Sequence, residues 1–421
     1  MKNWWPSLLL FAGLSSSFAG ERSRFDEAAL TGDWGGFRSK ESGVALKIGY
    51  TQEALGVVSG GLRRTGAYDA LVSIDLQLDL EKLLGWSGAT FHANAFDIIG
   101  SSLSSEAVGS ASNVSNINYR NSVRLYECYL EQTFCHEQIS FRIGQLAVDS
   151  EFFESGIGVV PGGGLFLNSD FGALPIVSFN APCAIYAIAT PGFRIKIAPT
   201  DSSYIQMGIY DGNPAPDLLG DPSPGFQSGN HYNDHGVDIH LDSSEGAFLI
   251  AEVGFTTKQG SYKVGAFYHT DRFTRWRDGA AVPGIWAAYA IASQKFCNEN
   301  ASDAQGLYGF ARWSLAPQDR ARLDWAGDAG FNYLGAIPGR DQDILGVAFS
   351  VKNYSRDFSA AEERSGQSAL EVESVFELTY QVNLAPCISV QPDFQYVLQP
   401  TGQGRTVPDA LIVGLRLNTL F

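Results

Sequence analysis

Basic and acidic side chains gather in one stretch in the middle of the chain. Arg142 precedes a long segment that carries several carboxylates, and Arg194 and Lys196 follow it. A guanidinium fork can bind two neighbouring hydroxyl groups or stack on a ring. With the carboxylates it would form a ring of both signs, which suits the orientation of a neutral polyol. The carboxylates in question are Asp149, Glu151, Glu154 and Asp170.

Plainer roles fit the same residues. Arg142 would balance carboxylates on neighbouring strands, and the acidic residues would be solvated in a loop or cap short hairpins. The spacing does not separate these roles from solute binding. Recognition of a polyol at this stretch is therefore a prediction, with charge balance as the alternative.

The sequence lacks common catalytic motifs. There is no Gly-x-Ser-x-Gly elbow and no His-Glu-x-x-His pair. His231, His235 and His240 lie close together with Asp234 and Asp238, but exposed loop histidines explain them better than a metal site does. We predict no enzyme activity, no metal and no cofactor.

The elements that must position these side chains show the alternation of β-strands. Between Ala70 and Leu80 the even positions are apolar and most odd positions are polar, and residues 411–421 alternate as well before the chain ends on Phe421. In a membrane barrel the apolar face meets lipid and the polar face lines a wet lumen. A β-sandwich with an apolar interior would show the same alternation.

Connection lengths favour the barrel. Short connections such as 135–137, 256–260 and 316–319 recur at every second junction, and most others are long. We predict an all-β fold, a transmembrane antiparallel β-barrel of about sixteen strands with a margin of about two. The strands are expected near 44–56, 69–81, 87–97, 122–134, 138–147, 191–199, 203–210, 236–256, 260–270, 306–315, 320–328, 329–335, 343–354, 369–383, 387–398 and 409–421.

The longest connection, 148–190, is glycine-rich and aromatic rather than polar. Its phenylalanines need burial, and a wide lumen is the available place. We predict that it folds into the pore as a constriction loop, with an external plug or a partner-binding loop as the alternative. Trp276, between Arg275 and Arg277 in the predicted connection 271–305, is the aromatic residue best placed for early contact with a sugar.

The ends of the chain indicate export. Residues 1–19 read as a signal peptide with a short apolar core, 20–43 as a periplasmic N-terminal segment, and 44–421 as the barrel. No run of about 18 apolar residues follows the signal peptide. The net charge of −16 argues against a nucleic-acid partner.

Five cysteines, an odd number, leave at least one thiol without a partner in the same chain. Cys135 and Cys387 fall at predicted short turns, whereas Cys183 and Cys297 fall in predicted long loops. Disulfides form readily outside the cytoplasm. We expect disulfide-linked neighbouring chains through one of these four, and an inert thiol at Cys128.

Several motifs resemble one known family. The run Leu30–Arg38 (LTGDWGGFR) resembles the N-terminal signature of the OprB-type carbohydrate-selective porins, and further matches follow in order to the C-terminus. The resemblance implies a sixteen-stranded outer-membrane barrel that admits sugars by facilitated diffusion, and recognition of Phe421 by the barrel-assembly machinery. The other matching stretches begin at Gly144, Glu151, Gly164, Ala189, Tyr210, Gln391 and Gly414.

The expected function is a porin of the bacterial outer membrane, in contact with its lipid, for sugars and similar small polar solutes. The alternation of the strands places more carboxylates than basic groups on the lumen side, so we expect the pore to prefer cations weakly. A general or dicarboxylate-selective pore is an alternative. So is a structural or adhesive surface barrel without significant transport.

Overall fold

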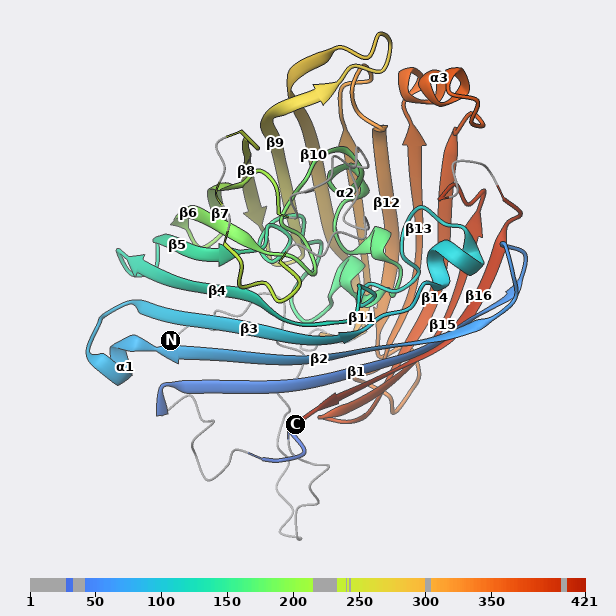
Figure 1. The fold of residues 1–421 in the computed structure, drawn as a ribbon. Coiled ribbons are helices and arrows are strands. Elements are labelled where there is room, and N and C mark those ends of the chain that lie inside the picture. The colour runs from blue at the N-terminus through green and yellow to red at the C-terminus, as the bar shows by residue number, and fades with distance from the viewer. Residues whose placement is uncertain are drawn as a thin grey trace.

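The computed structural model describes residues 28–32, 42–214, 233–239, 241, 244–299, 304–402 and 407–421. In them sixteen antiparallel strands close into one barrel, each paired with its neighbours in sequence, and β1 pairs with β16 (Figure 1). Closure leaves no open sheet edge, as a lipid-embedded sheet requires. The strands are β1 (Val44–Ser59), β2 (Gly66–Asp79), β3 (Ala89–Ile99), β4 (Ser122–Phe134), β5 (Ile139–Leu146), β6 (Thr190–Thr200), β7 (Ser203–Asp211), β8 (Ala247–Thr256), β9 (Gly260–Thr274), β10 (Ala281–Asn298), β11 (Gly306–Leu315), β12 (Leu323–Leu334), β13 (Ile344–Tyr354), β14 (Val372–Ala385), β15 (Ile388–Leu398) and β16 (Ala410–Leu420).

In the described residues, the helices lie in the connections between strands. None in the described part of the chain is long and apolar enough to cross a membrane. Ser355 caps α3 by accepting a hydrogen bond from the backbone N–H of Phe358 at 3.1 Å. The helical segments are α1 (Leu80–Leu84), η3 (Ser104–Val108), η4 (Gly162–Leu165), η5 (Ser169–Phe171), α2 (Pro175–Asn180) and α3 (Arg356–Arg364).

The polarity of the wall is reversed relative to a soluble protein. Large apolar side chains such as Val123, Trp313 and Phe331 are exposed on the outward face. Charged side chains are buried inside, as strand parity predicts. This arrangement separates a membrane barrel from a sandwich. The buried inward charges on the strands include Glu53, Glu127, Arg194, Glu373, Glu377 and Arg416.

The two ends of the barrel differ in their connections. One end, the short-turn end, carries the start of β1 and the end of β16. The opposite end, the long-loop end, carries the connections 60–65, 100–121, 147–189, 212–246, 275–280, 316–322, 355–371 and 399–409. Leu30 donates its backbone N–H to the Leu420 carbonyl at the short-turn end at 3.0 Å. The prediction that 316–319 is one of the turns at the short-turn end is wrong, since β11 and β12 join at the long-loop end.

Two errors in the predicted strands cancel in the count. β10 occupies Ala281–Asn298, which was expected to be loop, and the predicted strands 320–328 and 329–335 are one strand, β12. β10 lacks alternation because its inward residues, Ile285 to Ile291, are apolar too and pack on the constriction loop. In β12, Gly330 resembles a turn residue, but a Cβ there would lie 2.7 Å from the Phe310 ring. Close packing therefore explains this glycine.

The other predicted strand limits shift less. β8 begins at Ala247 instead of residue 236, and Glu371, expected on a strand, lies in the connection before β14. The signal peptide and most of the segment 20–43 lie outside the described residues, as do His231 and His240. His235 is described, and its Nδ1 lies 2.8 Å from the Val123 carbonyl oxygen.

All five cysteines are described, and no two of them form a disulfide. Cys135 and Cys387 lie in connections at the short-turn end, as predicted. Cys183 is buried in the segment 147–189. The placement of Cys297 in a long loop is wrong: it lies in β10, near the short-turn end, because that region is a strand. Cys135 and Cys297 are the exposed thiols among the five.

Candidate functional site in the barrel lumen

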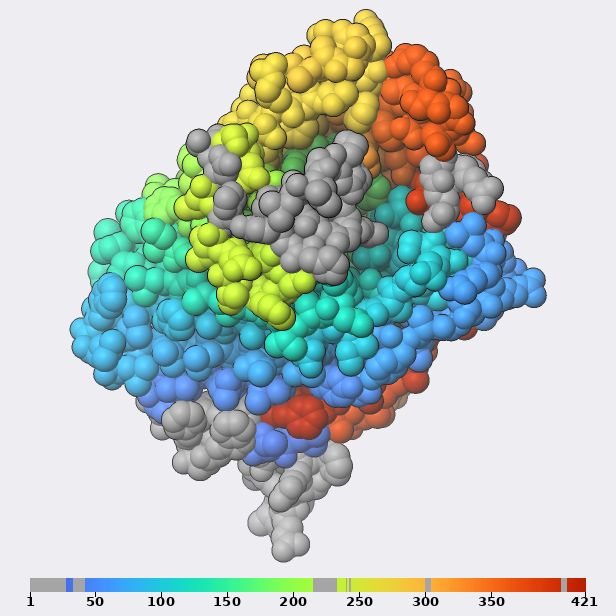
Figure 2. Space-filling view, viewed as in Figure 1, coloured from blue at the N-terminus to red at the C-terminus, as the bar shows by residue number. Residues whose placement is uncertain are grey.

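The segment 147–189, here called the constriction loop, lies inside the ring of strands, as predicted. Figure 1 shows it with α2 inside the barrel, and Figure 2 shows a hollow beside α3 in which parts of the interior are visible. Phe153 packs edge-on against Tyr289 of β10 at 5.0 Å, and Phe166 packs against Phe310 of β11 at 5.9 Å between ring centroids. The loop therefore fills part of the lumen with its own apolar core.

Arg194 on β6 joins the start of this loop to the wall. Its guanidinium donates to both oxygens of Glu151 at 2.5 and 2.7 Å, to Glu131 at 3.0 Å, and to the Ser140 hydroxyl at 2.5 Å. Arg142, opposite Arg194 on β5, contacts Glu151 at 3.3 Å and Glu131 at 3.1 Å. We call Arg142, Arg194, Glu131 and Glu151 the arginine–carboxylate cluster. The structure thus brings together three residues that the sequence singled out.

The two acidic residues at the start of the loop have different environments. Burial would raise the pKa of Glu151, but Arg142 and Arg194 outweigh it and lower the pKa to about 2. Asp149 accepts hydrogen bonds from the Tyr126 hydroxyl at 3.2 Å and the Tyr186 backbone N–H at 2.9 Å. Burial raises its pKa to about 6. Between pH 3 and 5, Glu151 therefore remains ionised while Asp149 holds a proton for most of that range.

Lys196 and Glu154 lie outside the cluster itself. The Lys196 ammonium is 4.4 Å from the centroid of the Tyr204 ring, within the range of a cation–π contact. The Tyr204 hydroxyl in turn donates to Glu252 on β8 at 2.7 Å. Glu154 is half-buried on the loop. The wall near the loop start thus carries both signs of charge over β4 to β8.

Arg312 on β11 holds the middle of the constriction loop from the opposite wall. It forms an ion pair with Asp328 of β12 at 2.8 Å. The same guanidinium donates to the backbone carbonyls of Gly172 at 2.5 Å and Asp170 at 2.9 Å. Its side chain is 1% exposed. This arginine is therefore an anchor for the loop backbone.

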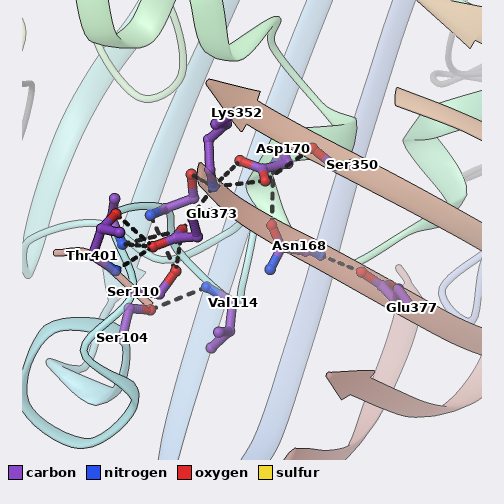
Figure 3. A network of polar contacts seen from close by, with 12 residues as sticks. Ser104, Ser110, Val114, Asn168, Asp170, Ser350, Lys352, Glu373, Glu377 and Thr401 are labelled. Atoms are coloured by element: carbon purple, nitrogen blue, oxygen red, sulfur yellow. Dashed lines mark hydrogen bonds and ion pairs between the residues drawn. The ribbon is translucent and has the colours of Figure 1, made fainter. Parts of the chain in front are cut away.

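Lys352 on β13 and Glu377 on β14 hold the neighbouring loop residues (Figure 3). The Lys352 ammonium contacts Asp170 at 2.7 Å. Glu377 accepts the backbone N–H groups of Leu167 at 2.5 Å and Asn168 at 2.9 Å. Asp170 was expected to stand at the narrowing, and the structure places its side chain between loop and wall, 1% exposed.

Trp276 lies at the rim, in the connection between β9 and β10. Its indole N–H donates to the Ala321 carbonyl at 3.0 Å, and its ring packs edge-on against Phe358 of α3 at 4.9 Å. Arg364 donates to the Trp276 carbonyl at 2.6 Å. The residue thus connects three segments of the long-loop end.

Sequence reasoning missed the anchors Arg312, Asp328 and Lys352. Each is a single charged residue at a position where the alternation of its strand faces the lumen. That position was the signal that could have identified it. Asp328 stood at the end of the predicted strand 320–328, at the boundary with the predicted strand 329–335. The role of Lys352 depends on loop residues far away in the chain.

A closed barrel with an apolar outer face and a charged, loop-narrowed lumen defines a porin of the outer membrane. The family model described as "Carbohydrate-selective porin, OprB family" matches residues 63–421. The chain belongs to this family, and it is an outer-membrane porin for the facilitated diffusion of sugars. Its family is one of channels rather than enzymes.

Curated relatives agree with this assignment, and a solved structure agrees with the fold. The chain is 23% identical to Porin B of Pseudomonas aeruginosa, over 97% of this chain and 94% of the relative. It is 22% identical to a putative porin, QuiX, of Acinetobacter baylyi, over 94% of each. The high-pH structure of Pseudomonas putida OprB superimposes with a TM-score of 0.82 at 21% identity, covering 94% of this chain and 99% of that one. This likeness supports the barrel fold.

Proposed function

We propose that sugars pass the lumen beside the partly exposed members of the arginine–carboxylate cluster. The observation that supports this is exposure: the side chains of Arg142 and Glu131 are 19% exposed and Glu151 is 12% exposed, against 1% for Arg194. Lys196 and Glu154 extend the same surface. Arg194 and Asp170 act as anchors of the constriction loop, and Trp276 connects segments at the rim of the long-loop end.

The chemistry of this surface suits a neutral polyol. A sugar hydroxyl can accept from Arg142 and donate to Glu131 or Glu151, so it exchanges water for charge-assisted hydrogen bonds. A neutral solute meets no Coulomb repulsion from the acidic wall. An anion is repelled over roughly 8–10 Å at physiological salt. The protein acts as a channel only, without a catalytic step.

In planar bilayers we expect ohmic channels with weak cation preference in salt gradients. Added mono- or oligosaccharide should lower the current, because sugars share the ion path. Arg142→Ala should weaken the sugar block and deepen the cation preference, since one lumen cation is lost. Arg275→Ala, which removes an arginine paired with Asp278 at the rim, is the matched control and should leave both unchanged.

Three other results would assign a different function. Clear anion selectivity would contradict the proposed charge of the path. Equal passage of sugars, salts and dicarboxylates, or tighter binding of dicarboxylates, would favour the general or dicarboxylate-selective pore. A folded barrel with no conductance would favour a structural or adhesive role.

We further propose that Phe421 is recognised during assembly. Its backbone N–H donates to the Ile48 carbonyl at 2.8 Å, so the residue lies where β16 closes on β1. Strand addition at a sheet edge is a physical mode for such recognition. Deletion of Phe421 should lower the amount of heat-modifiable barrel in the membrane, whereas Phe421→Trp should preserve it. Normal membrane levels of the deletion variant would refute the proposal.

Disulfide-linked neighbouring chains also stay a proposal. The exposed Cys135 and Cys297 are the best candidates because buried thiols cannot reach another chain. Identical migration with and without reductant on gels would exclude such links.

A further inference from the structure

Segments from distant parts of the chain meet at one buried ammonium group. Lys352 points from β13 into the lumen and is fully buried (Figure 3). Its nitrogen lies 2.7 Å from Asp170 of the constriction loop, 2.8 Å from Glu373 of β14 and 2.6 Å from the Ser112 hydroxyl of the connection 100–121. A lysine has three N–H donors, and these contacts use all of them.

Glu373 extends the contact to another loop. Its carboxylate accepts from the Ser110 hydroxyl at 2.8 Å and the Ala111 backbone N–H at 3.0 Å. It also accepts from the backbone N–H of Thr401 at 2.6 Å and from the Thr401 hydroxyl at 2.9 Å. Thr401 belongs to the connection 399–409. Three connections from the long-loop end therefore converge on the Lys352–Glu373 pair.

The charges around Lys352 make the contact between loops and wall depend on this lysine. Asp170 and Glu373 are both buried, and Lys352 is the cation that contacts each of them. Without it, two carboxylates would face each other with little water. One buried carboxylate without its cation is already strongly unfavourable. The simplest relief is for the loops to separate from the wall and let water in.

We propose that Lys352 is a positioning residue that couples the constriction loop to the connections 100–121 and 399–409 and thereby maintains the width of the pore. The backbone supports this coupling: Asn116 donates its N–H to the Leu167 carbonyl at 2.6 Å, and Ser169 donates to the Asn113 carbonyl at 2.9 Å. Lys352 does not contact the solute. The proposal concerns pore width, so its first measurement is the conductance without sugar, which does not depend on the proposed path along Arg142.

The test is the single-channel conductance of Lys352→Met in potassium chloride. We expect a larger conductance and more current noise than in the unaltered protein, because the loops lose their common attachment. Sugar block should weaken by about tenfold, which corresponds to about 1.4 kcal/mol. Lys352→Arg, which retains the charge, should restore most of the block. Unchanged conductance and block in assembled Lys352→Met would overturn the proposal.

A second variant avoids burying an unpaired charge. Ser112→Ala combined with Thr401→Val removes the hydroxyl contacts that these two residues make to Lys352 and Glu373. It keeps the Lys352–Asp170 pair, so the barrel should assemble even if Lys352→Met does not. Increased noise is expected, and unaltered traces would contradict the coupling. Arg340→Met is the control: it breaks a 2.7 Å pair with Asp343 within the connection that joins β12 to β13 at the short-turn end, and it should leave the conductance unchanged.

Discussion

Arg194→Met is expected to release the start of the constriction loop and produce a wider, noisier channel. The substitution leaves Glu131 and Glu151 without their most buried cation and removes every hydrogen bond of the guanidinium described above. Loss of one partner from a buried ion pair typically costs about 3–5 kcal/mol. Because the barrel strands keep their own hydrogen bonds, most of this cost should appear as local release of the loop.

Limited proteolysis of the folded barrel and single-channel recording would measure the release. Arg142→Met is the matched comparison, since the same carboxylates lose a cation that is 19% exposed. Its effect should be smaller, because water can solvate what remains. Equal effects of the two variants would show that burial of Arg194 does not decide the strength of this anchor.

Acid titration distinguishes the anchor from simple packing. The pKa of Glu151 is lowered from its ordinary 4.5 to about 2, so its contribution to stability is fully present above pH 4.5 and is lost as the pH falls toward 2. The unaltered channel should therefore keep its conductance down to about pH 3. In Arg194→Met the pKa of Glu151 should rise, and conductance should become pH-dependent in the acid range.

Arg312→Met is expected to have the other large effect, a loss of assembled protein. It leaves Asp328 buried without its cation and removes the donors to the carbonyls of Asp170 and Gly172. Each buried polar group left unpaired costs about 1–3 kcal/mol, in addition to the broken ion pair. The amount of heat-modifiable barrel in the membrane would measure this loss.

The double variant Arg312→Met with Asp328→Asn separates charge from packing. It removes the unpaired carboxylate, so assembly should recover in part, while the loop backbone still lacks its donors. Recovered barrels should then show a wider channel. Wild-type levels and conductance in Arg312→Met alone would mean that the remaining anchors suffice without Arg312.

Part of the candidate site could be predicted because it is close in sequence and in strand order. Arg142 and Arg194 lie on the adjacent strands β5 and β6 that flank the constriction loop, so parity and proximity bring them to Glu151. Asp170 could be placed on the loop but not given its partner. Lys352 follows it by 182 positions, and alternation within one strand contains no information about such a pair.

The sequence by itself determined the class of this protein, because polarity alternation and family motifs are local. It also indicated that an aromatic loop must be buried in the lumen. The tertiary structure decided which charges are anchors and which remain exposed. It also decided that β10 is a strand: its inward face is apolar because the constriction loop packs against it. Burial and long-range pairing depend on which segments meet inside the closed barrel, and no local pattern specifies them.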